Sequence, residues 1–173
     1  MVQRTQMVHR TQAKTSALAM VAMAIILQLF SIPTGNVSLS IDAPWWHRLT
    51  YHFFHANILH LIVNCWALLC IVFIYNIQSP MLVSAFIIAA LYPCESLNFL
   101  YPEGMLPTIG LSGICYALLG RYSLSVERKL YYNLWWAFFI GIGFLSPYSN
   151  AWLHLYCYLC GVVIAALNKP YKR

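Results

Sequence analysis

Residues 107–120, which read PTIGLSGICYALLG, decide how the rest of the chain is arranged. Pro107 and Gly110 are typical of a loop, and serine is favoured where a helix begins. We therefore expect Ser112 to open a helix that continues through the apolar residues behind it. The free N–H groups at such a helix start point at whatever lies in front of the serine.

Taken alone, this stretch has two interpretations. It does not match the G-x-S-x-G turn of soluble hydrolases, because position 114 is isoleucine. Small residues such as Gly110, Ser112 and Gly113 also line the interfaces between membrane helices. A helix-packing motif is therefore the simpler interpretation, and two other stretches of the chain are needed to decide.

The composition is that of a protein with several membrane-spanning segments. The 173 residues are 61% hydrophobic and only 8% charged, whereas soluble domains carry about 25% charged residues. The lipid bilayer is therefore an expected partner. The net charge of +6 does not predict nucleic-acid binding, because the basic residues cluster at loops and chain ends, which is a topology signal. The six cysteines lie in or beside apolar runs and imply no disulfide framework.

Six apolar segments predict an all-α membrane protein with six transmembrane helices. We expect these helices at residues 16–32, 55–75, 81–93, 112–124, 130–145 and 151–167. They form one membrane domain over residues 16–168, between polar tails at residues 1–15 and 169–173. A signal peptide is the alternative for residues 16–32. The polar lead is long for one, and no small-x-small cleavage motif follows, so a spanning helix is favoured.

The fourth segment, residues 112–124, is too short to cross a hydrocarbon core of about 30 Å. A short helix that is entered from a loop at membrane depth is tolerated where protein or a water-filled cavity surrounds it. We therefore expect this helix at the centre of the bundle, with Ser112 below the membrane surface.

The basic residues predict the orientation of the bundle. With six crossings, both chain ends lie on one side. That side holds three basic residues in the tail of residues 1–15, three at residues 121–129 and three at the C-terminal end, whereas Arg48 alone lies opposite. The positive-inside rule makes the first side cytoplasmic. Ser112 then opens toward the outer face, as does His154 near the outer start of the sixth segment.

Polar side chains recur in three of the segments, where they are costly and usually functional or paired. The second segment carries His55, His60 and Asn64, the fourth carries Ser112 and Tyr116, and the sixth carries His154 and Gly161. His60 and Asn64 lie one helical turn apart on one face. His55 points elsewhere and is expected to pack against the outer loop, which we define as residues 33–54.

These residues include the parts of a nucleophilic site. Histidine has the pKa that a general base for a serine needs near pH 7, and the oxyanion formed next needs hydrogen-bond donors. No acidic residue lies in the second, fourth or sixth segment, which excludes a Ser-His-Asp triad and leaves a Ser-His dyad. The simpler interpretation of a His or Asn in a bundle is an interhelical hydrogen bond. For Tyr116 and Gly161 it is helix packing.

No metal ion or cofactor is expected. Three histidines in or near the membrane could suggest a metal site. His55 and His60 are five residues apart, however, which is off the i, i+4 spacing of helical ligands, and no carboxylate joins them.

Three motifs together resemble the rhomboid family of intramembrane serine proteases. They are His55-x4-His60-x3-Asn64, Gly110-x-Ser112-Gly113 with Tyr116, and His154-x6-Gly161, in this order. The match covers residues 45–165 and implies the minimal six-helix form of the family. Two positions depart from the family pattern. Cys157 stands where a glycine often follows the histidine by three residues, and the Trp-Arg pair of the outer loop appears as Trp46-His47-Arg48.

The resemblance implies roles for these residues. Ser112 would be the nucleophile and His154 its general base. His60, Asn64 and the backbone N–H of Ser112 would form the oxyanion hole. Tyr116 would pack on the catalytic imidazole, with Gly110, Gly113, Gly161 and His55 in support. Gly141 and Gly143 would lie in a moving gate helix.

The expected function is that of a serine endopeptidase that cleaves transmembrane segments of membrane-protein substrates near the outer face. A bacterial inner membrane is the expected location. The alternative is a catalytically silent rhomboid-like binder of transmembrane segments, although such proteins lose the nucleophile or the base and this chain has both. A transporter or channel ranks last, because no internal repeat and no intramembrane carboxylate is present.

Overall fold

The computed structural model describes residues 2–30, 32–96, 107–146 and 148–168. These residues form seven α-helices and two short 3-10 helices, with no strand among them. The α-helices are α1 (Val2–Leu29), α2 (His47–Thr50), α3 (Ile58–Ile74), α4 (Ser79–Ala90), α5 (Ser112–Tyr122), α6 (Lys129–Gly143) and α7 (Ala151–Leu167). The 3-10 helices are η1 (Thr34–Asn36) and η2 (Tyr51–Phe53). The expected all-helical class is confirmed.

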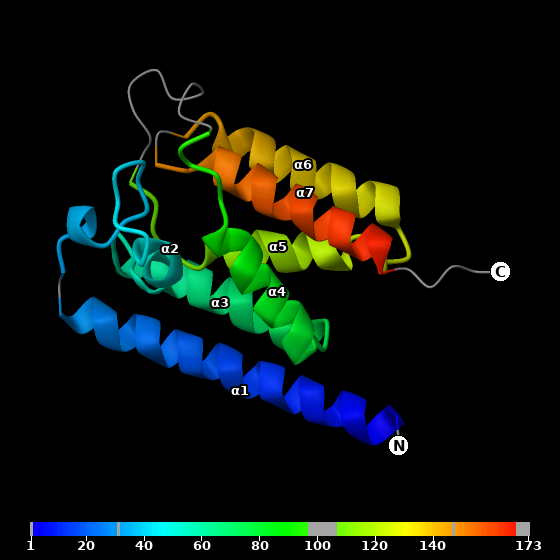
Figure 1. The fold of residues 1–173 in the computed structure, drawn as a ribbon. Coiled ribbons are helices and arrows are strands. Elements are labelled where there is room, and N and C mark those ends of the chain that lie inside the picture. Colours follow the sequence, from blue (N-terminus) through cyan, green and yellow to red (C-terminus); the bar gives the residue numbers. More distant parts are fainter. Residues whose placement is uncertain (1, 31, 97–106, 147, 169–173) are drawn as a thin grey trace.

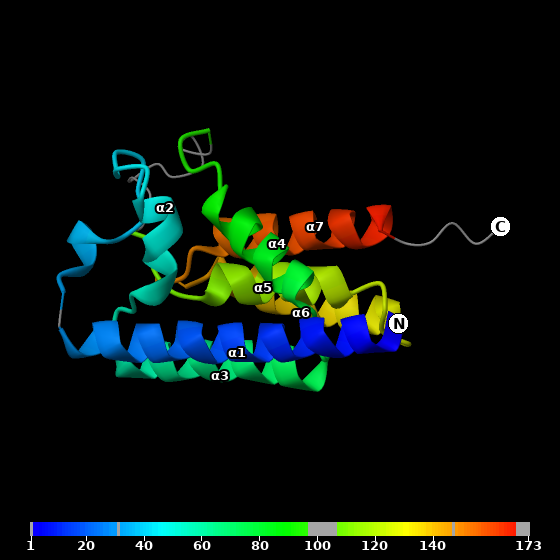
Figure 2. The ribbon, with the colours of Figure 1, turned by 60° about the horizontal axis from the view of Figure 1, so that its bottom comes forward.

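The six long helices form a bundle in which successive helices run in alternate directions (Figures 1 and 2). α3, α5 and α7 run one way, whereas α1, α4 and α6 run the other way. The start of α1 and the end of α7 therefore lie at the same end of the bundle. The short helix α2 and the loops around it sit at the opposite end, beside the start of α5.

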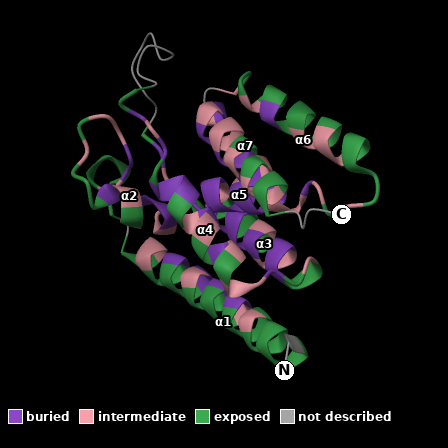
Figure 3. Cartoon of the chain, turned by 45° about the vertical axis from the view of Figure 1, so that its right-hand side comes forward, coloured by how far each residue is buried: buried purple, intermediate pink, exposed green. Residues whose placement is uncertain are grey.

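α5 is the central helix, and most of its residues are buried (Figure 3). Seven of its eleven residues are buried, and it packs against α3, α4 and α7. Its length of about 16 Å is roughly half of a bilayer's hydrocarbon core. The short central helix expected from the sequence is therefore present.

One helix is long and apolar enough to cross a membrane by itself among the described residues, Gln3–Leu29 in α1. The pair His47–Phe53 and Ile58–Ile74, which is bent by 98°, counts as a second only if it is one broken span. The other apolar helices are shorter than this test requires. The six crossings expected from the sequence therefore stay a prediction.

The start of α1 differs from the sequence-based expectation. A polar tail was expected up to residue 15, but the helix begins at Val2 and continues without a break to Leu29. The polar segment is also packed: Ala13 is fully buried, and the His9 ring lies 3.0 Å from the hydroxyl of Ser79 at the start of α4. The tail expected at residues 169–173 lies outside the described residues.

The other helix bounds agree within a few residues. The segment expected at 151–167 matches α7 at both ends. α3 begins at Ile58 rather than at residue 55, because Asn57 is its N-cap and accepts the backbone N–H of His60 at 2.9 Å. α4 ends at Ala90 and not at residue 93. The expectations 112–124 and 130–145 each run about two residues past the ends of α5 and α6.

Arg48 fastens the outer loop to the end of α4. Its guanidinium donates to the backbone oxygens of Tyr92 at 2.7 Å and Ala90 at 3.3 Å, and it forms an ion pair with Glu95. The hydrogen bond from Arg48 lowers the pKa of the Glu95 carboxyl below its ordinary value. The arginine of the displaced Trp-Arg pair thus still anchors this loop.

Candidate active site

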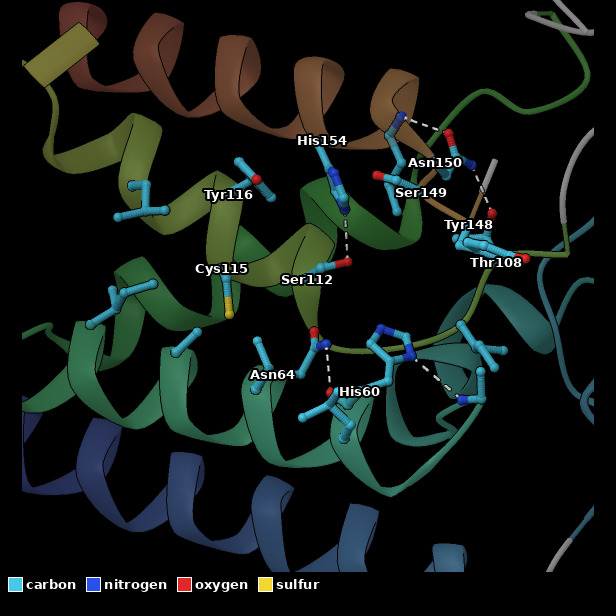
Figure 4. Close-up of a pocket in the computed structure, with 18 of the residues that line it drawn as sticks. His60, Asn64, Thr108, Ser112, Cys115, Tyr116, Tyr148, Ser149, Asn150 and His154 are labelled. Atoms are coloured by element: carbon cyan, nitrogen blue, oxygen red, sulfur yellow. Dashed lines mark hydrogen bonds between the residues drawn. The ribbon is translucent and has the colours of Figure 1, made fainter. Parts of the chain in front are cut away.

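Ser112 and His154 meet across the interface between α5 and α7. His154 Nε2 lies 3.0 Å from Ser112 Oγ, within hydrogen-bond distance (Figure 4). Ser112 is the first residue of α5, and His154 lies in the first turn of α7. Asn150 caps α7, because its side chain accepts the N–H of Leu153 and its backbone oxygen accepts the N–H of His154. The two residues that the sequence analysis paired as a Ser-His dyad are therefore in contact.

The ring of Tyr116 stacks on the imidazole of His154. The ring centroids are 4.3 Å apart and the planes differ by 22°. Tyr116 lies one turn below Ser112 on α5, and its ring also forms a T-shaped pair with the Trp136 ring of α6, with centroids 5.9 Å apart. The imidazole is thus held by a hydroxyl at one nitrogen and by an aromatic face along its plane.

His60 and Asn64 face the same space from α3 (Figure 4). The Nδ1 atom of His60 accepts the backbone N–H of Ala56 at 3.4 Å, so a neutral ring carries its proton on Nε2. One N–H of the Asn64 amide donates to the backbone oxygen of His60 at 2.9 Å. The second N–H of that amide and the Nε2–H of His60 remain as donors for a ligand.

Gly110 allows the loop to pass close to His60. Its φ of +108° is in the left-handed region that favours glycine. A Cβ atom at this position would lie 3.1 Å from both Cε1 and Nε2 of His60, and 3.5 Å from Cδ2 of His55. The backbone N–H of Gly110 donates to the backbone oxygen of Tyr51 at 3.0 Å. This hydrogen bond fixes the loop two residues before Ser112.

Gly113 and Gly161 serve the contact between α5 and its neighbours. A Cβ on Gly161 would lie 2.3 Å from the backbone oxygen of Ala117, so only glycine lets α7 approach α5 there. A Cβ on Gly113 would meet Ala89 at 3.2 Å and the sulfur of Cys157 at 3.5 Å. Cys157 therefore fills ordinary van der Waals space between the helices.

His55 lies beside the site but does not enter the main cavity. It is buried, and its ring is 5.1 Å from that of His60 between centroids. It lines a second, much smaller cavity with Phe54 and the end of α1. Burial lowers the pKa of His55 to about 4. This placement agrees with the expected role in outer-loop packing.

A cavity of about 960 Å³ contains the Ser112 and His154 side chains. Polar residues line the part of the cavity around Ser112, and apolar residues line the part that extends between α3, α5 and α6. The polar members are Thr34, Asn57, His60, Asn64, Thr108, Ser149, Asn150 and His154, and the apolar members include Val63, Ala67, Ile71, Ile74, Leu119 and Trp136. None of the described residues that line it carries a full charge.

Sequence reasoning missed Thr108 and Asn150. The side chain of Asn150 donates to the hydroxyl of Thr108 at 2.7 Å, directly beside the dyad (Figure 4). Asn150 precedes an apolar run, which is a recognisable N-cap signal. Thr108 has no comparable signal, because its partners are distant in the sequence.

Within the described residues, no group of three or more His, Cys, Asp or Glu side chains is placed to hold a metal ion. A comparison with curated proteins finds no match to this chain. A family model, described as the rhomboid domain, matches residues 42–170 and so spans the second half of the outer loop and all helices from α2 to α7. This match covers well over half of the chain and every motif described above, and the chain therefore belongs to the membrane-embedded rhomboid family.

Proposed function

We propose that this protein is an intramembrane serine endopeptidase that uses a Ser112–His154 dyad. The observation that carries the proposal is the 3.0 Å separation of Ser112 Oγ and His154 Nε2 inside a cavity large enough for a peptide segment. Membership of the rhomboid family, whose members include proteases and inactive relatives, is consistent with this chemistry.

In the proposed reaction His154 Nε2 accepts the hydroxyl proton of Ser112 while Oγ attacks the scissile carbonyl. The tetrahedral intermediate collapses when the imidazolium returns that proton to the leaving amine. Water then enters from the polar outer part of the cavity, gives a proton to His154 and attacks the acyl-enzyme. Ser112 regains its proton as the new carboxyl product leaves.

Donors from two helices would stabilise the oxyanion. His60 Nε2–H and the free N–H of the Asn64 amide lie across the cavity from Ser112, and the backbone N–H of Ser112 is one of the unpaired donors at the start of α5. Tyr116 holds the imidazole plane by stacking. No acidic group is needed to orient His154 in this arrangement.

The proposed substrates are membrane proteins whose transmembrane segment unwinds near the outer face. An intact helix shields its carbonyls, so segments with small or helix-breaking residues are favoured. In this proposal the six long helices cross a bacterial inner membrane, with the start of α1 and the end of α7 on the cytoplasmic side. The outer part of the cavity then faces water and its apolar part faces the bilayer.

Labelling with a fluorescent fluorophosphonate tests the proposal. The wild type purified in detergent is expected to react, and Ser112→Ala and His154→Ala are expected to remain unlabelled while eluting as folded protein. Labelling that persists in Ser112→Ala would end the assignment of the nucleophile. A folded wild type that never reacts would favour the silent binder of transmembrane segments instead.

A further inference from the structure

One hydrogen bond ties the loop before α5 to the start of α7. Asn150 Nδ2 donates to Thr108 Oγ1 at 2.7 Å. Thr108 lies four residues before Ser112, and Asn150 lies four residues before His154. The bond therefore joins the same two segments as the dyad itself, on the outer side of it (Figure 4).

The Asn150 end of this bond is coupled directly to His154. The Asn150 side-chain oxygen accepts the N–H of Leu153 at 3.0 Å, and its backbone oxygen accepts the N–H of His154 at 3.2 Å. A shift of Asn150 would therefore shift the first turn of α7 and the imidazole with it.

The Thr108 end is fixed to the outer loop. Thr108 and Leu39 exchange both backbone hydrogen bonds, at 2.8 and 3.0 Å. Two residues later, the backbone N–H of Gly110 donates to the backbone oxygen of Tyr51, a fully buried residue. Thr108 is thus a fixed point from which Asn150 can be held.

At the opposite end of the α5–α7 pair, two glycines determine the distance between the helices. Gly120 and Gly161 let the two backbones touch, since a Cβ on either would lie 2.1–2.3 Å from a backbone oxygen of the other helix. This contact is about two turns away from the dyad along each helix. The distance between the first turns of α5 and α7 must therefore be fixed by contacts near Ser112 and His154.

We propose that Thr108 and Asn150 are positioning residues that hold His154 within hydrogen-bond distance of Ser112. The proposal rests on the proposed function, because it assigns these residues to the same dyad. Neither residue takes part in a bond-making step. Their hydrogen bond, named the latch below, sets the distance over which the proton of Ser112 moves.

Three variants separate the latch from the helix cap. Thr108→Val removes the hydroxyl and keeps the backbone bridge to Leu39. Thr108→Ser keeps the hydroxyl and is the rescue variant. Asn150→Ser keeps an N-cap side chain of similar strength but is too short to reach Thr108. Thr50→Val is the matched control, because Thr50 is a half-buried threonine of the same outer region whose hydroxyl donates to the backbone oxygen of Trp46 in its own helix turn.

The readout is the labelling rate of detergent-purified protein at several concentrations of a fluorophosphonate. Thr108→Val and Asn150→Ser are each expected to lower the maximal rate by about ten- to 100-fold, because an ångström of misplacement has effects of this size. The half-saturating concentration stays unchanged, as the cavity is intact. Thr108→Ser and Thr50→Val react like the wild type, and the double variant is no slower than the slower single variant.

Intrinsic tryptophan fluorescence during heating reports the folded fraction for each variant. A Thr108→Val protein that labels at the wild-type maximal rate overturns the latch while leaving the proposed function in place. A rate that falls only in proportion to the folded fraction also overturns it, since that is a purely structural effect. If the wild type itself is folded and does not label, the proposed function fails, and the positioning role fails with it.

Discussion

The α5–α7 pair and helix α6 are packed in opposite ways. α5 buries seven of its eleven residues, and its backbone touches that of α7 at Gly120 and Gly161. α6 buries only Ile140 of its fifteen residues and packs mainly on α7. Both parts border the same cavity, α5 and α7 through the dyad and α6 through Trp136.

This difference separates two requirements of the proposed chemistry. Proton transfer needs Ser112 and His154 at a fixed distance, to which the close α5–α7 contact and the proposed latch of Thr108 and Asn150 both contribute. A bulky membrane substrate needs a side of the cavity that yields, and α6 has few interior contacts to lose. The gate role that the family resemblance implied for the helix with Gly141 remains a prediction, and its loose packing is consistent with it.

The most severe way to break the tight pair is Gly161→Ala. The new methyl would lie 2.3 Å from the backbone oxygen of Ala117 and 2.8 Å from the nitrogen of Arg121. Overpacking against backbone is expected to lower the unfolding free energy by about 3 kcal/mol. Fluorophosphonate labelling is expected to fall by more than about 100-fold as the dyad separates. Thermal unfolding and labelling of the same sample measure both effects.

Gly141→Ala is the matched control on α6, since no other atom lies within 4 Å of its new methyl. Labelling should stay at the wild-type rate, and stability should rise by about 0.5–1 kcal/mol, because alanine is the better helix former. Equal damage from the two alanines would remove the distinction between the tight and the loose region.

Much of the α5–α7 pair, the tight region, could be predicted from the sequence, because the residues that mark its helix ends are close together in the chain. Small residues and a loop before an apolar run placed the start of a helix at Ser112, and the bounds of α7 were found to the residue. The contact between Ser112 and His154 was also expected, from the order and spacing of three motifs. Local helix signals were sufficient to predict the helix bounds, and the resemblance to one family was sufficient to predict the contact.

The rest depended on contacts between distant residues. The helical start of α1 was missed because a polar segment has no apolar face to reveal it, although His9 packs on Ser79. The bond of Asn150 to Thr108 spans 42 residues, and no spacing rule connects the two. The bonds of Arg48 to the end of α4 were hidden for the same reason.

Acid is expected to destabilise η2, which the backbone hydrogen bond from Gly110 to the Tyr51 oxygen joins to the loop before α5. His52 is fully buried between the rings of Tyr51 and Phe86, and burial lowers its pKa to about 3. In the unfolded chain the same group titrates near its ordinary value of about 6.5. Below that pH His52 binds a proton in the unfolded state but not in the folded state. The unfolding free energy is therefore highest above about pH 6.5 with respect to this group, and it decreases as the pH falls.

His52→Phe should therefore reduce this acid sensitivity. Between pH 6.5 and 5 the variant is expected to lose about 1.5 kcal/mol less unfolding free energy than the wild type does. Denaturant unfolding in detergent at both pH values gives the difference, and any constant packing effect of the new ring cancels in it. An identical pH dependence in the two proteins would show that His52 has the same pKa in the folded and the unfolded state, and so that burial does not lower it.

Tyr116 tests the border between the two regions, because it contacts His154 of α7 and Trp136 of α6. Tyr116→Ala should slow labelling about tenfold, since stacked aromatic pairs contribute about 0.5–1.5 kcal/mol. Tyr116→Phe keeps the ring and should label at the wild-type rate. A Phe variant as slow as the Ala variant would assign the effect to the hydroxyl and not to stacking.

The smallest effect is expected outside the α5–α7 pair, at the ion pair of Arg48 and Glu95. Glu95 is 55% exposed, and exposed pairs contribute about 0–1 kcal/mol. Glu95→Gln should therefore change the melting temperature by a few degrees at most, and the change should shrink in high salt. Arg48→Ala should be more damaging at every salt concentration, because it also removes the bonds to the backbone oxygens of Ala90 and Tyr92. Melting curves of both variants at low and high salt make the comparison, and a Glu95→Gln effect as large as that of Arg48→Ala would move the anchor of the outer loop from the backbone oxygens to the carboxylate.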